Sequence, residues 1–526
     1  MKGKKLLAML TTAALTGSIL TGCGASAGNQ GQAQTAGDAA QSAETVQAGD
    51  AQTAEAAAPG ELDTSKEVAL TMYIISDRPA GQDVVDENLN KLLKEKLNCT
   101  LDIRWIGWGE YTNKYPLLFT SGEEFDMAYA SSTWLSAFSM ARKGAFKNLD
   151  ELWPTYAPKN FERQSDFAKE LATVDGHYYL VPTLLGTYSA YGPIYRTDLV
   201  EGSDWDGVME SFEDIEEYCD IVKETHPEIE PLDQYSMAPE WSYVYFRNHG
   251  YETLSSMRYL WFDVSEDHPQ VRPYYEIPET KEFLEMMKRW SDKGFFSKSA
   301  LSDTDSTKLQ NGKAALKVHN VDNYNNVSIV HPEWGFRYAN FNNHVAHIPF
   351  TTDSMVISNT SKNPERAMAL WELITSDREV YDAFYYGVLG ETYNLNEKGE
   401  FELTDMDLYA TSSMWAARTP EFNRSQVGSA DDYNSLRQGF EEQIAADPNG
   451  DRFSALSIDT TLFETELSAV TNVWQQYWWP LELGYTNDID ASLAEYEQMM
   501  KNAGVDKMIE EIQKQLDAYC DEHPLN

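Results

Sequence analysis

The spacing of apolar residues in the first part of the folded chain alternates between strand and helix periods. Val68–Ile75 (VALTMYII) is a mostly apolar run typical of a buried strand. Asp83 predicts a helix start, because apolar residues then recur at the spacing of one helical face, at Val85, Leu89, Leu92, Leu93 and Leu97. Further strands are predicted at Leu101–Trp105 and Phe125–Ala130, and further helices at Tyr111–Thr120 and Leu135–Lys143. This alternation predicts an α/β fold with a mostly parallel, doubly wound sheet.

Turn and capping signals place further elements along the rest of the chain. Asp175-Gly176 predicts a tight turn between two short strands within Val174–Pro182, and Glu151–Ser165 is predicted to be a loop. Ser211-Phe-Glu-Asp214 is a capping box at the start of a helix. The other predicted elements are a strand at Ile194–Asp198, a helix at Thr280–Lys293, a turn and strand at Asn311–Val318, and helices at Leu493–Met500 and Val505–Tyr519.

The N-terminus has the pattern of an export signal. Three lysines precede a mostly apolar run at Leu6–Leu20, which is shorter than the ~20 residues of a membrane-spanning helix. The run ends in Leu20-Thr-Gly-Cys23, which resembles the lipobox of bacterial lipoproteins. The resemblance implies a signal peptide at residues 1–22 and a diacylated Cys23, palmitate included, at the extracytoplasmic face of the cell membrane; a plain secretory leader is the alternative. Residues 23–65 then form a lipid-anchored flexible tether, since no aromatic residue follows Cys23 there.

Length and charge limit what the folded part can be. The 526 residues are enough for two or more domains of about 100–200 residues each. The 84 acidic residues outnumber the 41 basic ones and give a formal net charge of −43, which argues against binding the phosphate backbone of nucleic acids. Cys99, Cys219 and Cys520 are odd in number and widely spaced, so we expect buried free thiols.

Five motifs in order resemble the extracellular solute-binding proteins of ABC importers. They are Ser121–Asp126, Val174–Pro182, Ser211–Ile215, Asn311–Ala315 and Ser361–Ala367. Two later stretches, Tyr386–Tyr393 and Gly484–Ala518, resemble the long lipoprotein branch of this carbohydrate-type family, which is often called LipO-like and is distantly related to the maltose-binding protein. Together the matches span about Val68 to Ala518.

The resemblance implies a type II periplasmic-binding-protein-like fold, with two doubly wound α/β lobes joined by a hinge and a ligand closed between them. We expect lobe 1 at residues 66–190 with 350–400 returning to it, lobe 2 at 191–349 with part of 401–480, and additional C-terminal helices at 481–526. The crossings between lobes are expected near Tyr188–Arg196 and Pro349–Ile357. The implied partners are the permease subunits of an ABC importer, and we expect the protein to be a monomer.

Catalytic signatures are absent from the sequence. It contains no HExxH, no GxSxG, no phosphate-binding loop and no GxGxxG after a strand, so we expect no enzymatic activity and no cofactor. Asp447-Pro-Asn-Gly-Asp451 alternates like a calcium loop but lacks the glycine and the acid that an EF-hand needs, so a turn is expected and no metal site.

The sequence does offer aromatic residues interleaved with short polar groups after predicted strands. Sugar rings stack their C–H faces on flat aromatic rings, while their hydroxyls bond polar side chains in the ring plane. Ligands in open α/β sheets bind beyond the carboxyl ends of strands. The candidate ligand-binding residues are Trp108, Glu110, Ser132, Trp134, Tyr188, Tyr191, Trp241, Tyr243, Asn320, Asp322, Asn323, Tyr385, Tyr386, Trp415 and Arg418.

These observations favour a lipid-anchored receptor that captures a carbohydrate, an oligosaccharide by preference, and delivers it to an ABC permease. A receptor for a peptide or another polar solute is one alternative, because an aromatic cleft also suits peptides. A surface glycoside hydrolase, or an adhesin that binds glycans, is the other, since paired carboxylates could serve glycoside hydrolysis.

Overall fold

The computed structural model describes residues 62–525, except residues 109, 206, 236–240, 255–256, 304, 306, 406–408 and 410. The predicted leader, Cys23 and all but the end of the predicted tether lie outside the described residues. Among the described helices, none is both long and apolar enough to cross a membrane. A five-stranded sheet with one apolar core defines lobe 1 below, and a four-stranded and a three-stranded sheet that share a second core define lobe 2.

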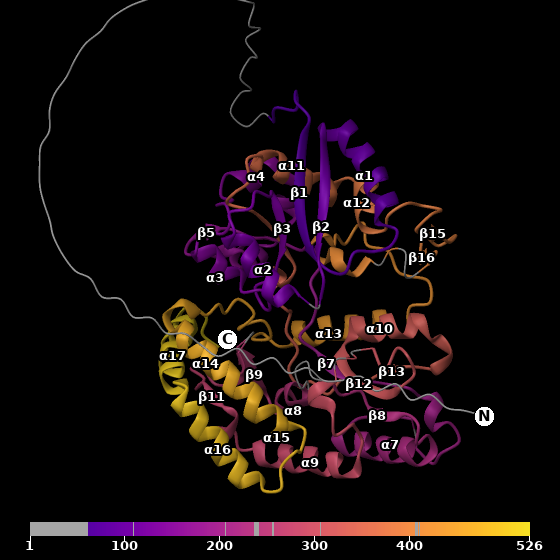
Figure 1. The fold of residues 1–526 in the computed structure, drawn as a ribbon, viewed down its shortest axis with the longest axis vertical. Helices are drawn as coiled ribbons and strands as arrows, with labels where there is room; N and C mark the ends of the chain where they lie inside the picture. The colour runs from indigo at the N-terminus through magenta and orange to yellow at the C-terminus, as the bar shows by residue number, and fades with distance from the viewer. Residues whose placement is uncertain are drawn as a thin grey trace, which may run out of the picture. The chain divides into compact units, whose positions relative to one another are not determined.

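Lobe 1 is built on a five-stranded sheet in the order β2-β1-β3-β14-β6 (Figure 1). Its strands are β1 (Val68–Ile75), β2 (Cys99–Ile106), β3 (Met127–Ala130), β6 (Val181–Pro182) and β14 (Ser354–Ile357). β1 runs parallel to β2 and β3, whereas β14 runs antiparallel to β3 and β6. This mixed sheet is still mostly parallel, as predicted, because β6 points the same way as β1, β2 and β3, and β14 alone enters from the opposite end.

Helices cover the lobe 1 sheet, and the first three lie close to the predicted positions. They are α1 (Gln82–Leu97), α2 (Tyr111–Thr120), α3 (Ala137–Arg142), α4 (Leu152–Tyr156), α5 (Pro158–Arg163), α6 (Asp166–Leu171), α11 (Pro364–Ser376) and α12 (Arg378–Tyr385). α1 begins after Gly81, and Asp83 lies in its first turn rather than at its cap. The predicted loop at Glu151–Ser165 is wrong, because Pro158 takes the first position of α5, where proline favours a helix.

Two local signals fold as predicted. Asp175 and Gly176 have φ angles of 51° and 85° and form the turn between β4 (Thr173–Val174) and β5 (His177–Tyr178). The Ser211 hydroxyl accepts a bond from the Asp214 N–H while the Asp214 carboxylate accepts one from the Ser211 N–H. This capping box opens α7 (Phe212–Thr225) in lobe 2.

Lobe 2 contains a four-stranded and a three-stranded sheet. The first has the order β13-β7-β12-β8 and the second β11-β10-β9. The strands are β7 (Tyr191–Tyr195), β8 (Glu230–Leu232), β9 (Tyr251–Leu254), β10 (Met257–Asp263), β11 (Arg272–Pro273), β12 (Ala314–Asn320) and β13 (Arg337–Tyr338). The helices are α7, α8 (Trp241–Asn248), α9 (Thr280–Lys293), α10 (Val321–Val330) and α13 (Tyr433–Ala446). Only β8 and β12 pair in parallel in the larger sheet, so it is mixed too.

The last helices pack on lobe 2 (Figure 1). They are α14 (Glu464–Val473), the π-helix η8 (Trp474–Trp478), α15 (Trp479–Glu482), α16 (Ile489–Asn502) and α17 (Val505–Glu522). Trp478 is fully buried and stacks on Tyr274, with ring centres 3.7 Å apart. Cys99, Cys219 and Cys520 are buried free thiols, as predicted.

Three passages of chain connect the lobes. The first and second run side by side, as shown by backbone bonds from Thr183 N to Asp353 O (2.8 Å) and from Ser189 N to Ala346 O (2.9 Å). The third follows the hairpin of β15 (Tyr393–Leu395) and β16 (Phe401–Leu403) and the short helix η6 (Thr411–Ala417). Along it Val427 N bonds Phe401 O in lobe 1, and Ala430 N bonds the Asn325 side chain in lobe 2. The lobe limits expected from the sequence remain predictions.

Candidate functional site

Three indole rings from separate segments meet at one edge of lobe 1. Trp108 follows β2, Trp134 follows β3, and Trp415 lies in η6. The ring of Trp108 lies 5.8 Å from that of Trp134 and 6.0 Å from that of Trp415, at interplanar angles of 32° and 41°. Tyr111 packs edge-on against Trp108 and Trp134. Trp108 is 41% exposed, so this cluster, called the aromatic platform below, presents an indole to solvent.

Buried polar groups lie beneath the aromatic platform. The ring of Tyr129 lies 5.7 Å from Trp134 and 6.3 Å from Trp415. Its hydroxyl donates a 2.6 Å hydrogen bond to Asp353, which also forms an ion pair with Arg418. Burial, and then the charge of Asp353, raise the pKa of Tyr129 well above its ordinary value. The phenol therefore stays neutral and holds the carboxylate and the rings in place.

Arg418 joins the aromatic platform to lobe 2. Its Nε donates to the carbonyl of Trp415 (3.2 Å), and one of its Nη atoms lies 3.9 Å from the Asp322 carboxylate of lobe 2. The side chain is only 13% exposed. Burial opposes its charge, but Asp353, Tyr385 and Asp322 outweigh burial and raise the pKa of Arg418 above its usual range. The guanidinium is therefore a permanent cation between the two lobes.

Asp322 receives hydrogen bonds from α13. It lies in the first turn of α10, whose cap is the side chain of Asn320 accepting from Asn323 N (2.9 Å). Its Oδ1 accepts from the Tyr433 hydroxyl (2.7 Å) and from Arg437 (3.1 Å). A carboxylate at a helix N-terminus with two such donors is fixed in position.

A second aromatic group lies in lobe 2. Tyr191 is paired with Asn320 in the β7–β12 ladder, and its ring stacks on His319 at 5.5 Å. Tyr243 packs edge-on against Tyr191 at 5.1 Å and accepts a hydrogen bond from Arg247. Tyr191 and Tyr243 thus lie together, and Asn320 links them to the helix that carries Asp322.

Other predicted residues lie outside these groups. Trp241 is 3% exposed and packs edge-on against Trp290 in the lobe 2 core. Tyr386 is fully buried and accepts a bond from Arg424 N, while Tyr385 stacks on Tyr381. Neither Trp241 nor Tyr386 presents a ring to solvent. We therefore leave both out of the site proposed below.

The remaining candidates lie around the passages and the rim. The Tyr188 hydroxyl donates to Glu441 (2.6 Å), and the guanidinium of Arg437 lies 4.9 Å from its ring centre. The Ser132 hydroxyl lies 2.9 Å from that of Thr351 in the second passage. Glu110 is exposed and forms an ion pair with Lys114 (2.6 Å). Tyr188 and Ser132 therefore contact the chain that connects the lobes.

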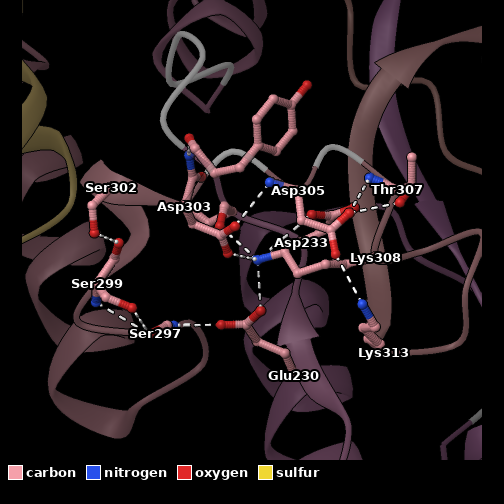
Figure 2. Close-up of polar contacts among 12 residues, drawn as sticks. Glu230, Asp233, Ser297, Ser299, Ser302, Asp303, Asp305, Thr307, Lys308 and Lys313 are labelled. Carbon is pink, nitrogen blue, oxygen red and sulfur yellow. Dashed lines mark hydrogen bonds and ion pairs between the residues drawn. The ribbon is translucent and has the colours of Figure 1, made fainter.

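Lobe 2 also contains a buried ammonium among carboxylates (Figure 2). The Nζ of Lys308 donates to Glu230 (2.7 Å), to the carbonyl of Gln234 (2.7 Å) and to Asp303 (3.0 Å). Burial disfavours its charge, but Glu230 and Asp303 outweigh burial and raise the pKa of Lys308. The chain thus supplies this acidic cluster with a cation of its own. Within the described residues, no group of three or more His, Cys, Asp or Glu side chains could hold a metal ion.

Sequence reasoning missed Tyr129, Asp353, Tyr433 and Arg437. Asp353 immediately precedes β14, whose first residue, Ser354, pairs with Ala130 at the end of β3. The antiparallel direction of β14 therefore brings its beginning to the edge where the other strands end. A search limited to residues after strands could not find it. Tyr433 and Arg437 belong to α13, which reaches the site through the third passage.

Comparisons with known proteins agree with this architecture. Residues 75–381 match the family described as bacterial extracellular solute-binding protein, and residues 455–521 match a domain of unknown function (DUF3502). The chain is 25% identical over 471 residues to a carbohydrate ABC transporter substrate-binding protein of Streptococcus pneumoniae serotype 4 (strain ATCC BAA-334 / TIGR4), with 87% of this chain and 92% of that one covered.

Solved structures show the same fold. The N-glycan transport solute binding protein NgtS of Streptococcus pneumoniae, in complex with Man1GlcNAc, superposes with a TM-score of 0.70 at 22% identity, covering 86% of this chain and 100% of that one. The alginate-binding protein AlgQ2 without calcium ion superposes with a TM-score of 0.63 at 15% identity, covering 86% and 98%. The expected two-lobe, periplasmic-binding-protein-like fold is thereby confirmed.

Proposed function

This chain belongs to the bacterial extracellular solute-binding proteins, and from that premise we propose that it captures an oligosaccharide between its lobes and delivers it to an ABC permease. The carbohydrate relative in Streptococcus pneumoniae and the N-glycan-binding structural neighbour support a sugar ligand. Solute-binding proteins of this family are extracytoplasmic components of transporters rather than enzymes.

The aromatic platform is the observation that carries the proposal. Trp108, Trp134 and Trp415 offer adjoining flat apolar faces, on which the C–H faces of sugar rings stack. Arg418 and Asp322 lie at its border and supply charged donors and acceptors for hydroxyl groups. A site with ring faces beside fixed polar groups suits a carbohydrate better than it suits an ion or a lipid.

Ligand capture then works through the contacts between the lobes. Sugar rings bind to lobe 1 by stacking, and the hydroxyls that point away from the platform bond the groups around Asp322 in lobe 2. A ligand that contacts both lobes stabilises the closed state, since it binds that state better than the open one. A micromolar dissociation constant corresponds to about −8.2 kcal/mol, which a few stacked rings and several hydrogen bonds supply.

We further propose that the protein is a monomer held at the membrane by lipid chains on Cys23. The lipobox-like Leu20–Cys23 and the aromatic-free segment after it support the anchor and the flexible tether. A tethered receptor stays close to the permease subunits while its lobes open and close. Mass spectrometry of the membrane-extracted protein tests the anchor: a diacylglycerol on the N-terminal Cys23 is expected, and a mature chain that starts elsewhere contradicts it.

Binding of defined saccharides tests the function. Thermal-shift screening against mono-, di- and pentasaccharides, with peptide panels in parallel, is expected to raise the Tm only with saccharides. Trp108→Ala is expected to weaken saccharide binding about 30-fold, that is by ~2 kcal/mol, because a stacked aromatic anchor is lost. Trp334→Ala, which removes a lobe 2 indole stacked on His331, is the control and leaves the affinity unchanged. A Tm shift with peptides alone sinks the proposal.

A further inference from the structure

A groove between the lobes adjoins the segment that carries Trp134 of the aromatic platform. Its lobe 1 side is formed by Ser132, Ser136, Phe138 and Ser139, on and just before α3. Its opposite side is formed by residues of β9 and β10 and by the segment 453–460. Ser132 lies two positions before Trp134 of the platform and is bonded to Thr351 in the second passage. The groove and the platform therefore share one edge of lobe 1.

The groove is lined by hydroxyl groups, phenyl rings and aliphatic side chains. Phe262 and Phe453 pack edge to face with ring centres 4.7 Å apart, while Phe138 belongs to the lobe 1 side. Five serines and two threonines interleave with these rings. The polar part of the lining therefore consists mostly of hydroxyl groups, each of which can donate and accept a hydrogen bond.

The charge of the lining selects the ligand class. Among the described residues that line the groove, none is Lys or Arg. Its carboxylate, Glu252, is paired with the buried guanidinium of Arg247. Arg142 and Lys143 lie beside the groove but are already paired with Asp459 and Glu464, so a carboxylate-bearing sugar would meet no unpaired countercharge and would lose its hydration, which is costly. The lining therefore suits an uncharged saccharide, whose hydroxyls exchange bonds with Ser and Thr and whose ring faces contact phenyl groups.

The C-terminal domain supplies one side of this groove. Asp459, in the segment 453–460, is held by Gln515 of α17, which accepts from Asp459 N (2.7 Å). Across the groove, Lys143 at the end of α3 forms an ion pair with Glu464, the first residue of α14. Arg142 lies 3.9 Å from Asp459. The helices of residues 455–521 therefore position this side of the groove against lobe 1.

We propose that this groove is a second arm of the ligand site and takes an uncharged branch or extension of the oligosaccharide held on the aromatic platform. The domain of unknown function at residues 455–521 then has a defined role, which is to build the far side of that arm. The inference rests on the proposed function, because the platform must hold the first sugar units. The groove narrows the ligand class to neutral oligosaccharides that are too long or too branched to bind on the platform alone.

Filling the groove tests the proposal. Ser139→Trp on α3 and Leu456→Trp on the opposite side each place an indole in the groove, and Ser468→Trp on the exposed face of α14 is the control. Titration calorimetry uses two probe pairs, Man5GlcNAc with Man1GlcNAc and β-1,4-mannopentaose with mannobiose. In both filled variants the larger probe is expected to lose at least about tenfold in affinity, or ~1.4 kcal/mol, and the smaller about twofold at most. Melting curves confirm that each variant is folded.

A charged saccharide with the same backbone gives a second readout. Penta-β-1,4-mannuronate has the backbone of mannopentaose with a carboxylate on every unit, and it is expected to bind the wild type at least about tenfold more weakly. Equal losses for large and small probes in the filled variants overturn the groove assignment, as does a wild type that binds mannobiose as tightly as mannopentaose; in both cases the proposed function survives. A wild type that binds no saccharide overturns both proposals.

Discussion

The two halves of the proposed site differ in chemistry: lobe 1 contributes exposed aromatic rings, and lobe 2 contributes a hydrogen-bonded carboxylate. The lobe 1 half is an aromatic platform whose outermost ring, Trp108, is 41% exposed. In the lobe 2 half, Asp322 is already bonded to Tyr433 and Arg437 before any ligand is present. Any flat ring that covers an exposed apolar face makes binding more favourable. A carboxylate that is already hydrogen-bonded can accept a further bond only from a hydroxyl in the right place. For the proposed ligand we therefore expect lobe 1 to provide affinity and lobe 2 to provide selection.

The ion pair between Arg418 and Asp353 lies between the two halves of the site. Its loss is expected to have the largest effect on stability. Arg418→Ala removes a guanidinium that is 13% exposed and leaves Asp353, 6% exposed, without its cation. We expect the unfolding free energy to fall by about 3–5 kcal/mol, because removing one member of a buried pair leaves an uncompensated charge. Urea denaturation followed by tryptophan fluorescence measures it.

A surface ion pair serves as the control for this variant. Arg289 is paired with Glu216 in lobe 2 at 2.9 Å, but its side chain is 52% exposed. Arg289→Ala is expected to cost less than about 1 kcal/mol, as exposed pairs do. Similar losses of unfolding free energy in the two variants would mean that the Arg418–Asp353 pair is solvated. The pair would then not be a buried contact that stabilises the region between the lobes.

The halves are also expected to differ in their response to pH. The helix α8, which carries Tyr243 of the lobe 2 half, is held at Ser242 N by the buried carboxyl of Glu482 (2.8 Å). Burial raises the pKa of Glu482 to about 8. A carboxyl whose pKa is raised by folding stabilises the protein fully below its unfolded value, near 4.3, and loses that contribution as pH rises to about 8. The stability of lobe 2 should therefore fall over this window.

Glu482→Gln tests the pH response. Each unit of pKa shift corresponds to about 1.4 kcal/mol, so the wild type is expected to lose roughly 3 kcal/mol between pH 5 and pH 7.5. Glutamine stays neutral, so the slope attributable to this group should disappear, although the variant loses an acceptor for the Trp478 indole N–H. Calorimetric melting from pH 5 to pH 8 measures the slope. If the stability of the variant falls with pH as steeply as that of the wild type, another group causes the pH response.

The sequence predicts the lobe 1 half better than the lobe 2 half, for a physical reason. Trp108 and Trp134 directly follow strands of the sheet, and local periodicity locates those strands to within about two residues. Their convergence needs only that β2 and β3, which lie on either side of β1 and run parallel to it, end at the same edge. The lobe 2 partners Tyr433 and Arg437 lie more than a hundred residues from Asp322, and only the third passage brings them there. No local pattern encodes such a contact.

Local patterns also fail to separate a cleft from a core. Trp241 had the same sequence signature as Trp134, an aromatic residue near short polar groups, yet it packs against Trp290. Asp353 had no signature, because the direction of β14 depends on how the chain returns from lobe 2. Periodicity reports which face of an element is apolar, but the tertiary fold decides whether another element or a ligand covers that face.

The most direct test of the comparison removes one aromatic ring from each half. Trp415→Ala opens the aromatic platform and is expected to weaken binding of mannopentaose about 30-fold, or ~2 kcal/mol. Tyr191→Ala removes a lobe 2 ring that stacks on His319 and is expected to cost about fivefold, or ~1 kcal/mol, because the bonds of Asp322 remain. Titration calorimetry gives both values, and Trp415→Phe should recover part of the loss since a flat ring returns. If Tyr191→Ala costs more than Trp415→Ala, affinity resides in lobe 2 and the assignment of the halves is reversed.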